Sequence, residues 1–172
     1  SLACNVIGYT VSGNVGQYGI EQQYSDTLNG EDGRSYNYLN EDLEQDKTIK
    51  AAVDGESVVS TVDVTLQKIV EKAIDDFQEK YANAAREGDG SKTAAAIMDP
   101  NTGEVLAMAS NRRYDLNNPY DVVANGLYSE EDAANLSEED RLNALNELWR
   151  NFCVSDTYEP GSTAKPITVA AA

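Results

Sequence analysis

Near its C-terminal end the chain reads Tyr158-Glu159-Pro160-Gly161-Ser162-Thr163-Ala164-Lys165-Pro166. The Pro-Gly pair breaks the preceding structure and allows a tight turn. Residues 163–172 are mostly small and apolar, so we expect a helix there. Pro166 is compatible with it, because the N–H groups of a first helical turn have no partner inside the helix. The stretch therefore predicts a helix that begins at or just after Ser162.

The spacing of Ser162 and Lys165 predicts a nucleophile with its base. Residues three apart share one face of a helix, so the hydroxyl and the amine can meet. Serine is a poor nucleophile until a base takes its proton, and lysine serves when burial or nearby positive charge lowers its pKa. The chain has no histidine, which excludes Ser-His-Asp and Cys-His arrangements within these 172 residues. Alone, however, the spacing also fits a capping serine followed by a solvated lysine.

The longer string E-P-G-S-T-x-K-P resembles the first active-site motif of penicillin-binding proteins, the D,D-transpeptidases that cross-link peptidoglycan. Further stretches resemble class B members of this family, in the expected order along the chain. These stretches are Tyr18–Tyr24 with Leu28–Gly33, Ser60–Gln67 and Thr93–Ser110. The resemblance therefore covers most of the chain.

The resemblance implies an α+β chain with two parts. Residues 1–60 would be the C-terminal part of a β-rich bridging or dimerisation domain. Residues 61–172 would be the N-terminal part of a transpeptidase domain with the β-lactamase-like α/β fold. The family's S-x-N and K-T-G motifs should follow Lys165, and nothing in the sequence matches them there. Ser12-Gly13-Asn14 and Lys92-Thr93-Ala94 come close in letters but lie upstream, so we interpret both as coincidence and expect the chain to be part of a longer protein.

The resemblance also implies a mechanism through an acyl-enzyme. Ser162 would attack the D-Ala-D-Ala carbonyl of a peptidoglycan stem peptide, and Lys165 would accept the serine proton. The amine of a neighbouring stem peptide would then resolve the ester, and β-lactam antibiotics would be trapped on Ser162. No metal or organic cofactor is implied. Because one oxyanion donor would come from the K-T-G strand, we expect the 172 residues alone to be inactive.

Two alternatives remain open from the sequence. One is a serine β-lactamase or β-lactam sensor with the same S-x-x-K motif, although neither needs a long bridging region. The other is a non-enzymatic role, in which residues 1–60 dock cell-division or elongation proteins. Family members carry an N-terminal membrane anchor, so we expect a cell-membrane protein whose catalytic domain lies on the extracytoplasmic side.

The amino-acid composition limits the classes of molecule that the chain could bind. The net charge of -17 argues against nucleic acid, whose phosphates would repel the chain, and leaves no basic patch for anionic lipid. No apolar run approaches the roughly 20 residues of a membrane span. Cys4 and Cys153 fit no metal-ligand spacing, so we expect two free, mostly buried thiols.

Local patterns predict the elements of the first 62 residues. We expect a turn over 12–16, a short helix over 21–28, and strands over 6–11, 36–39, 48–51 and 57–62.

Helical spacing after Asp63, an expected N-cap, predicts a helix to about Ala85. Its core stripe would be Leu66, Ile69, Val70, Ala73, Phe77 and Tyr81. A hairpin is expected over 93–98 and 104–110, across a turn that ends at Gly103.

Acidic first turns predict helices after Ser129 and Ser137. The second helix carries Leu142, Leu145, Leu148, Trp149 and Phe152. In the family that the chain resembles, the loop and helices before the nucleophile flank the substrate groove. The resemblance therefore makes Trp149 and Tyr158 candidates to line it, although core packing is the safer interpretation.

Overall fold

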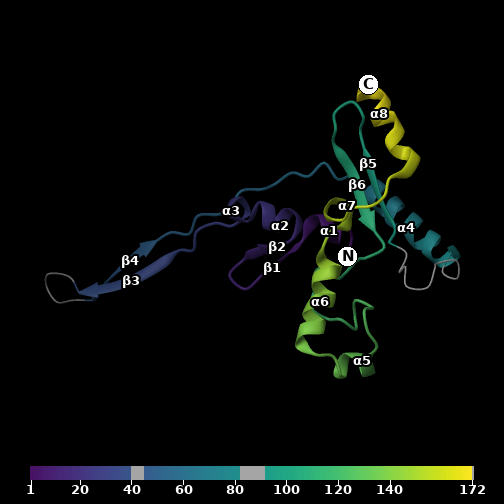
Figure 1. Ribbon diagram of the computed structural model, residues 1–172. Helices are drawn as coiled ribbons and strands as arrows, with labels where there is room; N and C mark the ends of the chain where they lie inside the picture. Colours follow the sequence, from purple (N-terminus) through teal and green to yellow (C-terminus); the bar gives the residue numbers. More distant parts are fainter. Residues whose placement is uncertain (40–44, 82–91, 172) are drawn as a thin grey trace.

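The computed structural model describes residues 1–39, 45–81 and 92–171 (Figure 1). These residues form a mixed α/β structure with three two-stranded antiparallel sheets, as the coarse fold prediction requires. The elements in chain order are α1 (Cys4–Ile7), β1 (Tyr9–Val11), β2 (Val15–Gln17), α2 (Gly19–Gln23), α3 (Ser25–Leu28), β3 (Arg34–Leu39), β4 (Gln45–Lys50), α4 (Val64–Tyr81), β5 (Ala94–Met98), β6 (Val105–Ser110), α5 (Glu130–Ala134), α6 (Glu138–Trp149), α7 (Phe152–Ser155), the 3-10 turn η1 (Gly161–Ala164) and α8 (Lys165–Ala171).

The first 28 residues form short elements that differ in part from the prediction. The expected strand over 6–11 is wrong in its first half, because residues 4–7 form helix α1. Strand β1 pairs with β2 across the predicted turn, with Val11 opposite Val15. The expected helix over 21–28 is split into α2 and α3 at Tyr24.

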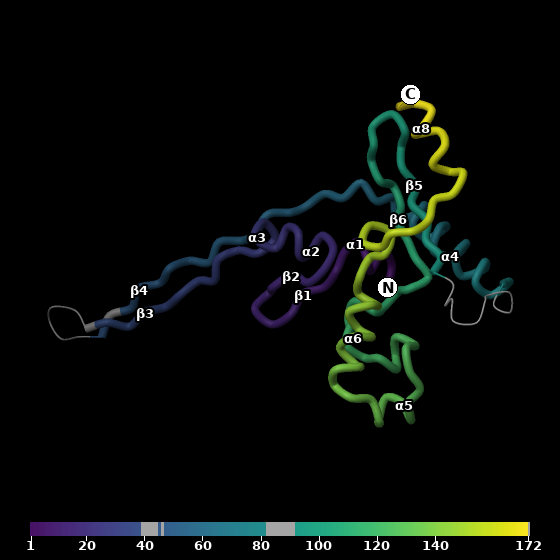
Figure 2. Tube along the Cα trace, viewed as in Figure 1, coloured from purple at the N-terminus to yellow at the C-terminus, as the bar shows by residue number. Residues whose placement is uncertain are grey.

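Strands β3 and β4 form a hairpin that points away from the rest of the chain (Figure 2). Both strands were predicted, and Tyr36 and Ile49 on them are exposed. The strand expected over 57–62 is absent. Thr61 Oγ1 donates to Val105 O of β6 at 2.7 Å, but within the described residues the segment forms no backbone ladder with another strand, and a strand is stable only with cross-strand partners. Val59 is almost fully exposed there.

Helix α4 packs against the β5–β6 hairpin. Asp63 caps it as predicted, since its Oδ1 accepts hydrogen bonds of 2.8 Å from the N–H groups of Thr65 and Leu66. The expected end of this helix near Ala85 lies outside the described residues. The predicted stripe is only partly correct, because the buried face holds Gln67, Val70, Glu71 and Ile74, whereas Ile69, Ala73 and Phe77 are exposed.

The β5–β6 hairpin matches the prediction closely. Asp99 N donates to Glu104 O at 2.9 Å and closes the turn. Gly103 has φ +79°, a left-handed conformation that glycine adopts without strain. Ala107 and Ala109 on β6 are buried against Val70 and Ile74 of α4 and form a small core.

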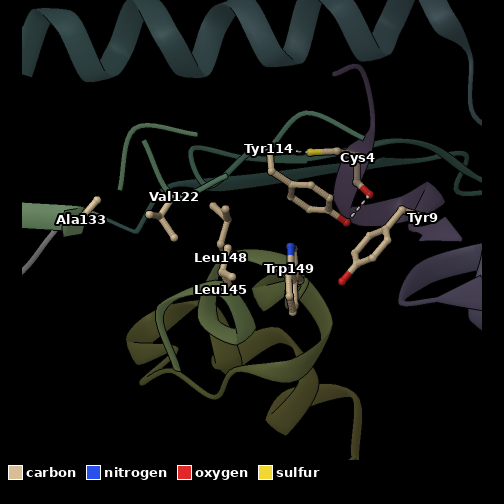
Figure 3. Packing of buried hydrophobic residues seen from close by; sticks show 8 residues of the cluster. All are labelled: Cys4, Tyr9, Tyr114, Val122, Ala133, Leu145, Leu148 and Trp149. Carbon is tan, nitrogen blue, oxygen red and sulfur yellow. Dashed lines mark hydrogen bonds between the residues drawn. The ribbon is translucent and has the colours of Figure 1, made fainter. Parts of the chain in front are cut away.

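The larger core lies between the N-terminus, the segment after β6 and helix α6 (Figure 3). Tyr114 O–H donates to Cys4 O at 3.2 Å, and Trp149 Nε1–H donates to Pro119 O at 3.0 Å. Its buried members are Cys4, Tyr9, Tyr114, Val122, Ala133, Leu145, Leu148 and Trp149. The segment after β6 therefore contributes two of these core side chains, Tyr114 and Val122.

Candidate active site

The segment that leads to Ser162, residues 151–161, consists of the short helix α7, an extended stretch and a turn. Asn151 caps α7 through its Oδ1, which accepts from Cys153 N at 3.1 Å. The chain then runs extended from Asp156, and Gly161 turns it with φ +56°, which glycine tolerates best. Thr163 closes the turn, because its N–H and its hydroxyl both donate to Pro160 O.

Ser162 lies in η1 and Lys165 begins α8. The predicted helix entry is therefore present, with one 3-10 turn ahead of the α-helix. Side chains three residues apart lie on the same side of a 3-10 turn, so Ser162 and Lys165 share one side of this helix entry. Both residues are exposed, and no hydrogen bond joins Ser162 Oγ to Lys165 Nζ.

Helix α8 presents apolar side chains to solvent. Ile167 and Val169 are 74% and 76% exposed. Figure 1 shows α8 at the C-terminal end of the chain, at the same end of the molecule as the turn of the β5–β6 hairpin. Within the part of the chain that the structure describes, nothing covers this helix on its apolar side.

A groove of about 390 Å³ lies beside Trp149, and a second of about 550 Å³ lies along β5. The second is the one next to the serine motif, because residues 152–158 form one of its walls. Its lining residues are Lys92, Ala94, Ala95, Ala96, Phe152, Cys153, Asp156, Thr157 and Tyr158. Tyr158 is 82% exposed and lines this groove, whereas Trp149 is buried in the core.

Neither cysteine is placed as a reactive thiol. Both are free, as predicted, and Cys4 is buried while Cys153 is half-buried. Burial raises the pKa of both thiols, so neither forms the reactive thiolate readily at neutral pH. The Cys153 Sγ–H group donates a hydrogen bond to Ala109 O of β6 at 3.7 Å.

The other sequence motifs have structural roles. Ser129 and Ser137 cap α5 and α6, as predicted, by accepting hydrogen bonds from Asp132 N and Asp140 N at 3.1 Å. Residues 12–14 form the β1–β2 turn. Among the described residues, no group of three or more Cys, Asp or Glu is placed to hold a metal ion. No helix in these ranges has the length and apolar character needed to cross a bilayer.

One residue beside the site was missed by the sequence analysis. Asp156 ends α7 and makes ion pairs with Lys92 and Arg150, at 2.7 and 2.6 Å. The sequence separation of these three residues gives no sign of the contact, because Lys92 comes from the start of the hairpin and Arg150 from the end of α6.

Residues 93–172, which hold the Ser162–Lys165 pair, match the family model described as penicillin binding protein transpeptidase domain. The chain is also 33% identical over its whole length to Stage V sporulation protein D from Bacillus subtilis. Over 95% of its length it is 29% identical to peptidoglycan D,D-transpeptidase MrdA from Haemophilus influenzae. The predicted relation to class B penicillin-binding proteins is therefore confirmed.

The chain spans 23% and 22% of the lengths of these two relatives. Among solved structures it is similar to Penicillin Binding Protein 2X from Streptococcus thermophilus. That likeness has a TM-score of 0.49 and 23% identity, over 76% of this chain and 19% of the other.

Proposed function

We propose that this chain supplies the nucleophile and its base to a peptidoglycan D,D-transpeptidase. Ser162 is the nucleophile and Lys165 is the general base. The observation that carries the proposal is the placement of this pair at the exposed entry of α8, inside the residues that match the transpeptidase domain. The relative from Haemophilus influenzae is itself named a peptidoglycan D,D-transpeptidase.

In the proposed acylation step, Ser162 Oγ forms a bond to the carbonyl carbon of the penultimate D-Ala of a stem peptide. Lys165 Nζ accepts the hydroxyl proton and passes it to the departing nitrogen. The peptide C–N bond breaks and terminal D-Ala leaves. An amine of a second stem peptide then attacks the ester carbonyl carbon and forms the cross-linking amide bond. Its proton passes by way of Lys165 Nζ to Ser162 Oγ as the ester C–O bond breaks, which restores the Ser162 hydroxyl. Each proton and electron pair is accounted for without a cofactor.

A β-lactam follows the same first step. Ser162 opens the ring amide, but the departing nitrogen stays tethered to the acyl group, so the adduct persists. A fluorescent penicillin should therefore label Ser162 in the gene product that contains these residues together with an S-x-N and a K-T-G motif.

The test uses Ser162→Ala, which should abolish labelling. Ser155→Ala is the matched control, because Ser155 is another exposed serine in the segment that leads to Ser162 and should leave labelling unchanged. Undiminished labelling of Ser162→Ala would refute the assignment. Rapid turnover of the penicillin, rather than a lasting adduct, would support the β-lactamase alternative instead.

We further propose that residues 1–60 belong to a bridging domain and that residues 61–172 begin the transpeptidase domain. The hairpins β1–β2 and β3–β4 support a β-rich character for the first part. We place the activity outside the cytoplasmic membrane, because peptidoglycan lies there. Proteolysis of intact spheroplasts tests this, since cleavage of the protein by external protease is expected and full protection would contradict it.

Residues 1–60 also remain a proposed docking module for cell-division or elongation proteins. The exposed β3–β4 hairpin, with Tyr36 and Ile49 on its surface, supports this role. Deleting residues 34–50 should release such a partner from the purified complex, and unchanged co-purification would count against it.

A further inference from the structure

Asp156 is the last anchored residue before Ser162. Its Oδ2 lies 2.7 Å from Lys92 Nζ, and its Oδ1 lies 2.6 Å from Arg150 Nη2. The first contact is a hydrogen bond, whereas Oδ1 has no hydrogen bond and its contact is an ion pair only. The Asp156 side chain is 18% exposed and lies between the two cations Lys92 and Arg150, at the start of the extended segment that leads to Ser162.

The partners of Asp156 connect three parts of the structure. Lys92 precedes β5, and Arg150 follows α6. Glu147 of α6 extends the network, because its Oε2 lies 3.6 Å from Arg150 Nη2 and 3.3 Å from Arg112 Nη1. Asp156 therefore connects the segment that leads to Ser162 both to the residue before β5 and to the end of α6.

The three residues after Asp156 have no such support. Thr157, Tyr158 and Glu159 make no hydrogen bond or ion pair within the described residues. The next hydrogen bond along the chain is the local turn at Pro160. The position of Ser162 relative to the sheet thus depends on where Asp156 holds the chain.

The carboxylate is charged under working conditions. The hydrogen bond from Lys92, with the positive charges of Arg150 and Arg112, holds the pKa of Asp156 below its usual range. An isolated surface ion pair contributes little to stability. A partly buried carboxylate shared by two cations restricts the position of its backbone more, because both contacts must be kept at once.

We propose that Asp156 is a positioning residue for the serine motif. Through Lys92 and Arg150 it fixes residues 157–160, and through them Ser162, without contacting substrate. The consequence for acylation rests on the proposed function, whereas the effect on the order of the segment does not.

The direct test measures backbone order in the 172-residue chain by ¹⁵N relaxation. In the parent chain, residues 157–159 should have order parameters of about 0.8, and in Asp156→Asn they should fall below about 0.6. Asp156→Glu should restore most of the order. Asp76→Asn is the matched control, because it removes an exposed ion pair with Lys72 on α4 and should leave the segment unchanged.

Either of two relaxation results would overturn the proposal: a segment that is already mobile in the parent chain, or one that stays ordered in Asp156→Asn. Two further variants, Lys92→Met and Arg150→Met, keep the Asp156 carboxylate and remove one of its cation partners. They test the same contacts if Asp156→Asn fails to fold. Each should loosen the segment in part, and full order in both together would also overturn it.

The functional test uses the gene product that carries the later motifs. Asp156→Asn should lower the rate of penicillin acylation roughly 10- to 100-fold, because small misplacement of a reacting group is costly. Non-covalent affinity for the antibiotic should not change, and Asp156→Glu should recover most of the rate. An unchanged acylation rate would refute the link to Ser162. If Ser162→Ala were still labelled, the proposed function would fail, and the relaxation data alone would decide the role of Asp156.

Discussion

At the residue scale, Gln67 shows how a polar side chain can complete a sheet. Its Nε2 donates to Met108 O, and its Oε1 accepts from Met108 N, both at 2.9 Å. The same Nε2 also donates to Glu71 Oε1 at 2.9 Å. Gln67 thus occupies the place of a neighbouring strand beside β6, although it is fully buried.

Replacing Gln67 by leucine should lower the free energy of unfolding by about 2–4 kcal/mol, because the partly buried N–H and C=O groups of Met108 lose their partners. Urea unfolding followed by the fluorescence of Trp149, the only tryptophan, measures the loss. Gln22→Leu, at an exposed position on α2, should change stability by less than about 0.5 kcal/mol. Equal stability of the two variants would contradict the bridging role.

Asp121 gives a prediction for pH. Its Oδ1 accepts from the N–H groups of Ala124 at 2.9 Å and Val123 at 3.0 Å, which lowers the pKa of this carboxyl. A lowered folded-state pKa stabilises the fold at pH values above the unfolded pKa of about 3.9. That contribution is lost as the pH falls through the lower, folded value.

Asp121→Asn should therefore reduce stability at pH 7 and pH 5, and the difference from the parent chain should shrink below about pH 4. Urea unfolding at pH 7, 5 and 3 gives the comparison. A difference that stays constant across this range would show that the charge of Asp121 is not involved.

At this scale the sequence suggested candidate reactive residues, but it did not predict which side chains contact one another. Ser162 and Lys165 were named from their spacing, and their roles stay predictions. Gln67 and Asp156 were missed, because each depends on one partner about 40 or more residues away, Met108 for Gln67 and Lys92 for Asp156. No local pattern encodes such a pairing.

At the element scale, capping was the most predictable feature. Ser137 Oγ accepts from Asp140 N and donates to Asp140 Oδ2 at 2.6 Å, so the first turn of α6 is closed from both sides. The serine and the acidic residue three positions later are both visible in the sequence. The stripe of α4 was less predictable, because the buried polar Gln67 and Glu71 face the sheet in place of Ile69 and Ala73.

Ser137→Ala should destabilise the chain by about 1 kcal/mol, since α6 loses its N-cap. Ser137→Asp keeps an acceptor at the same position and should lose much less. Thermal unfolding monitored by circular dichroism compares the two variants. Identical melting of the parent chain and the alanine variant would mean that the cap does not contribute.

At the scale of the whole molecule, the N-terminus and the segment after β6 share one core. The Ser1 amino group donates to Tyr114 O at 3.0 Å, and Ala3 N donates to Glu71 Oε1 at 2.8 Å. Cys4 and Tyr9 pack with Tyr114 and Trp149. The domain boundary proposed near residue 60 stays a prediction, and these contacts cross it.

Removing residues 1–9 should therefore open the core. The fluorescence maximum of Trp149 should shift to longer wavelength, and the hydrophobic dye ANS should bind. Replacing residues 34–50 by a short glycine-serine turn is the control, because the β3–β4 hairpin lies away from this core and its loss should leave the signal unchanged. An unshifted spectrum after the N-terminal deletion would contradict the shared core.

The whole-molecule outline was predictable where motifs follow one another in order, as for the serine motif and the β5–β6 hairpin. It was not predictable where packing joins distant segments. The strand expected over 57–62 illustrates the difference, since its β-branched residues have strand propensity but no partner strand in the described residues.

The central claim, that Ser162 is an acylated nucleophile served by Lys165, is tested most directly by locating a penicillin adduct. The gene product that contains these residues and the later motifs is treated with penicillin, cleaved by trypsin after Arg150 and analysed by mass spectrometry. We predict one adduct, on Ser162 of the peptide that begins at Asn151, and at least about a 100-fold slower reaction in Lys165→Ala. An adduct on another residue, or an unchanged rate in the Lys165 variant, would contradict it.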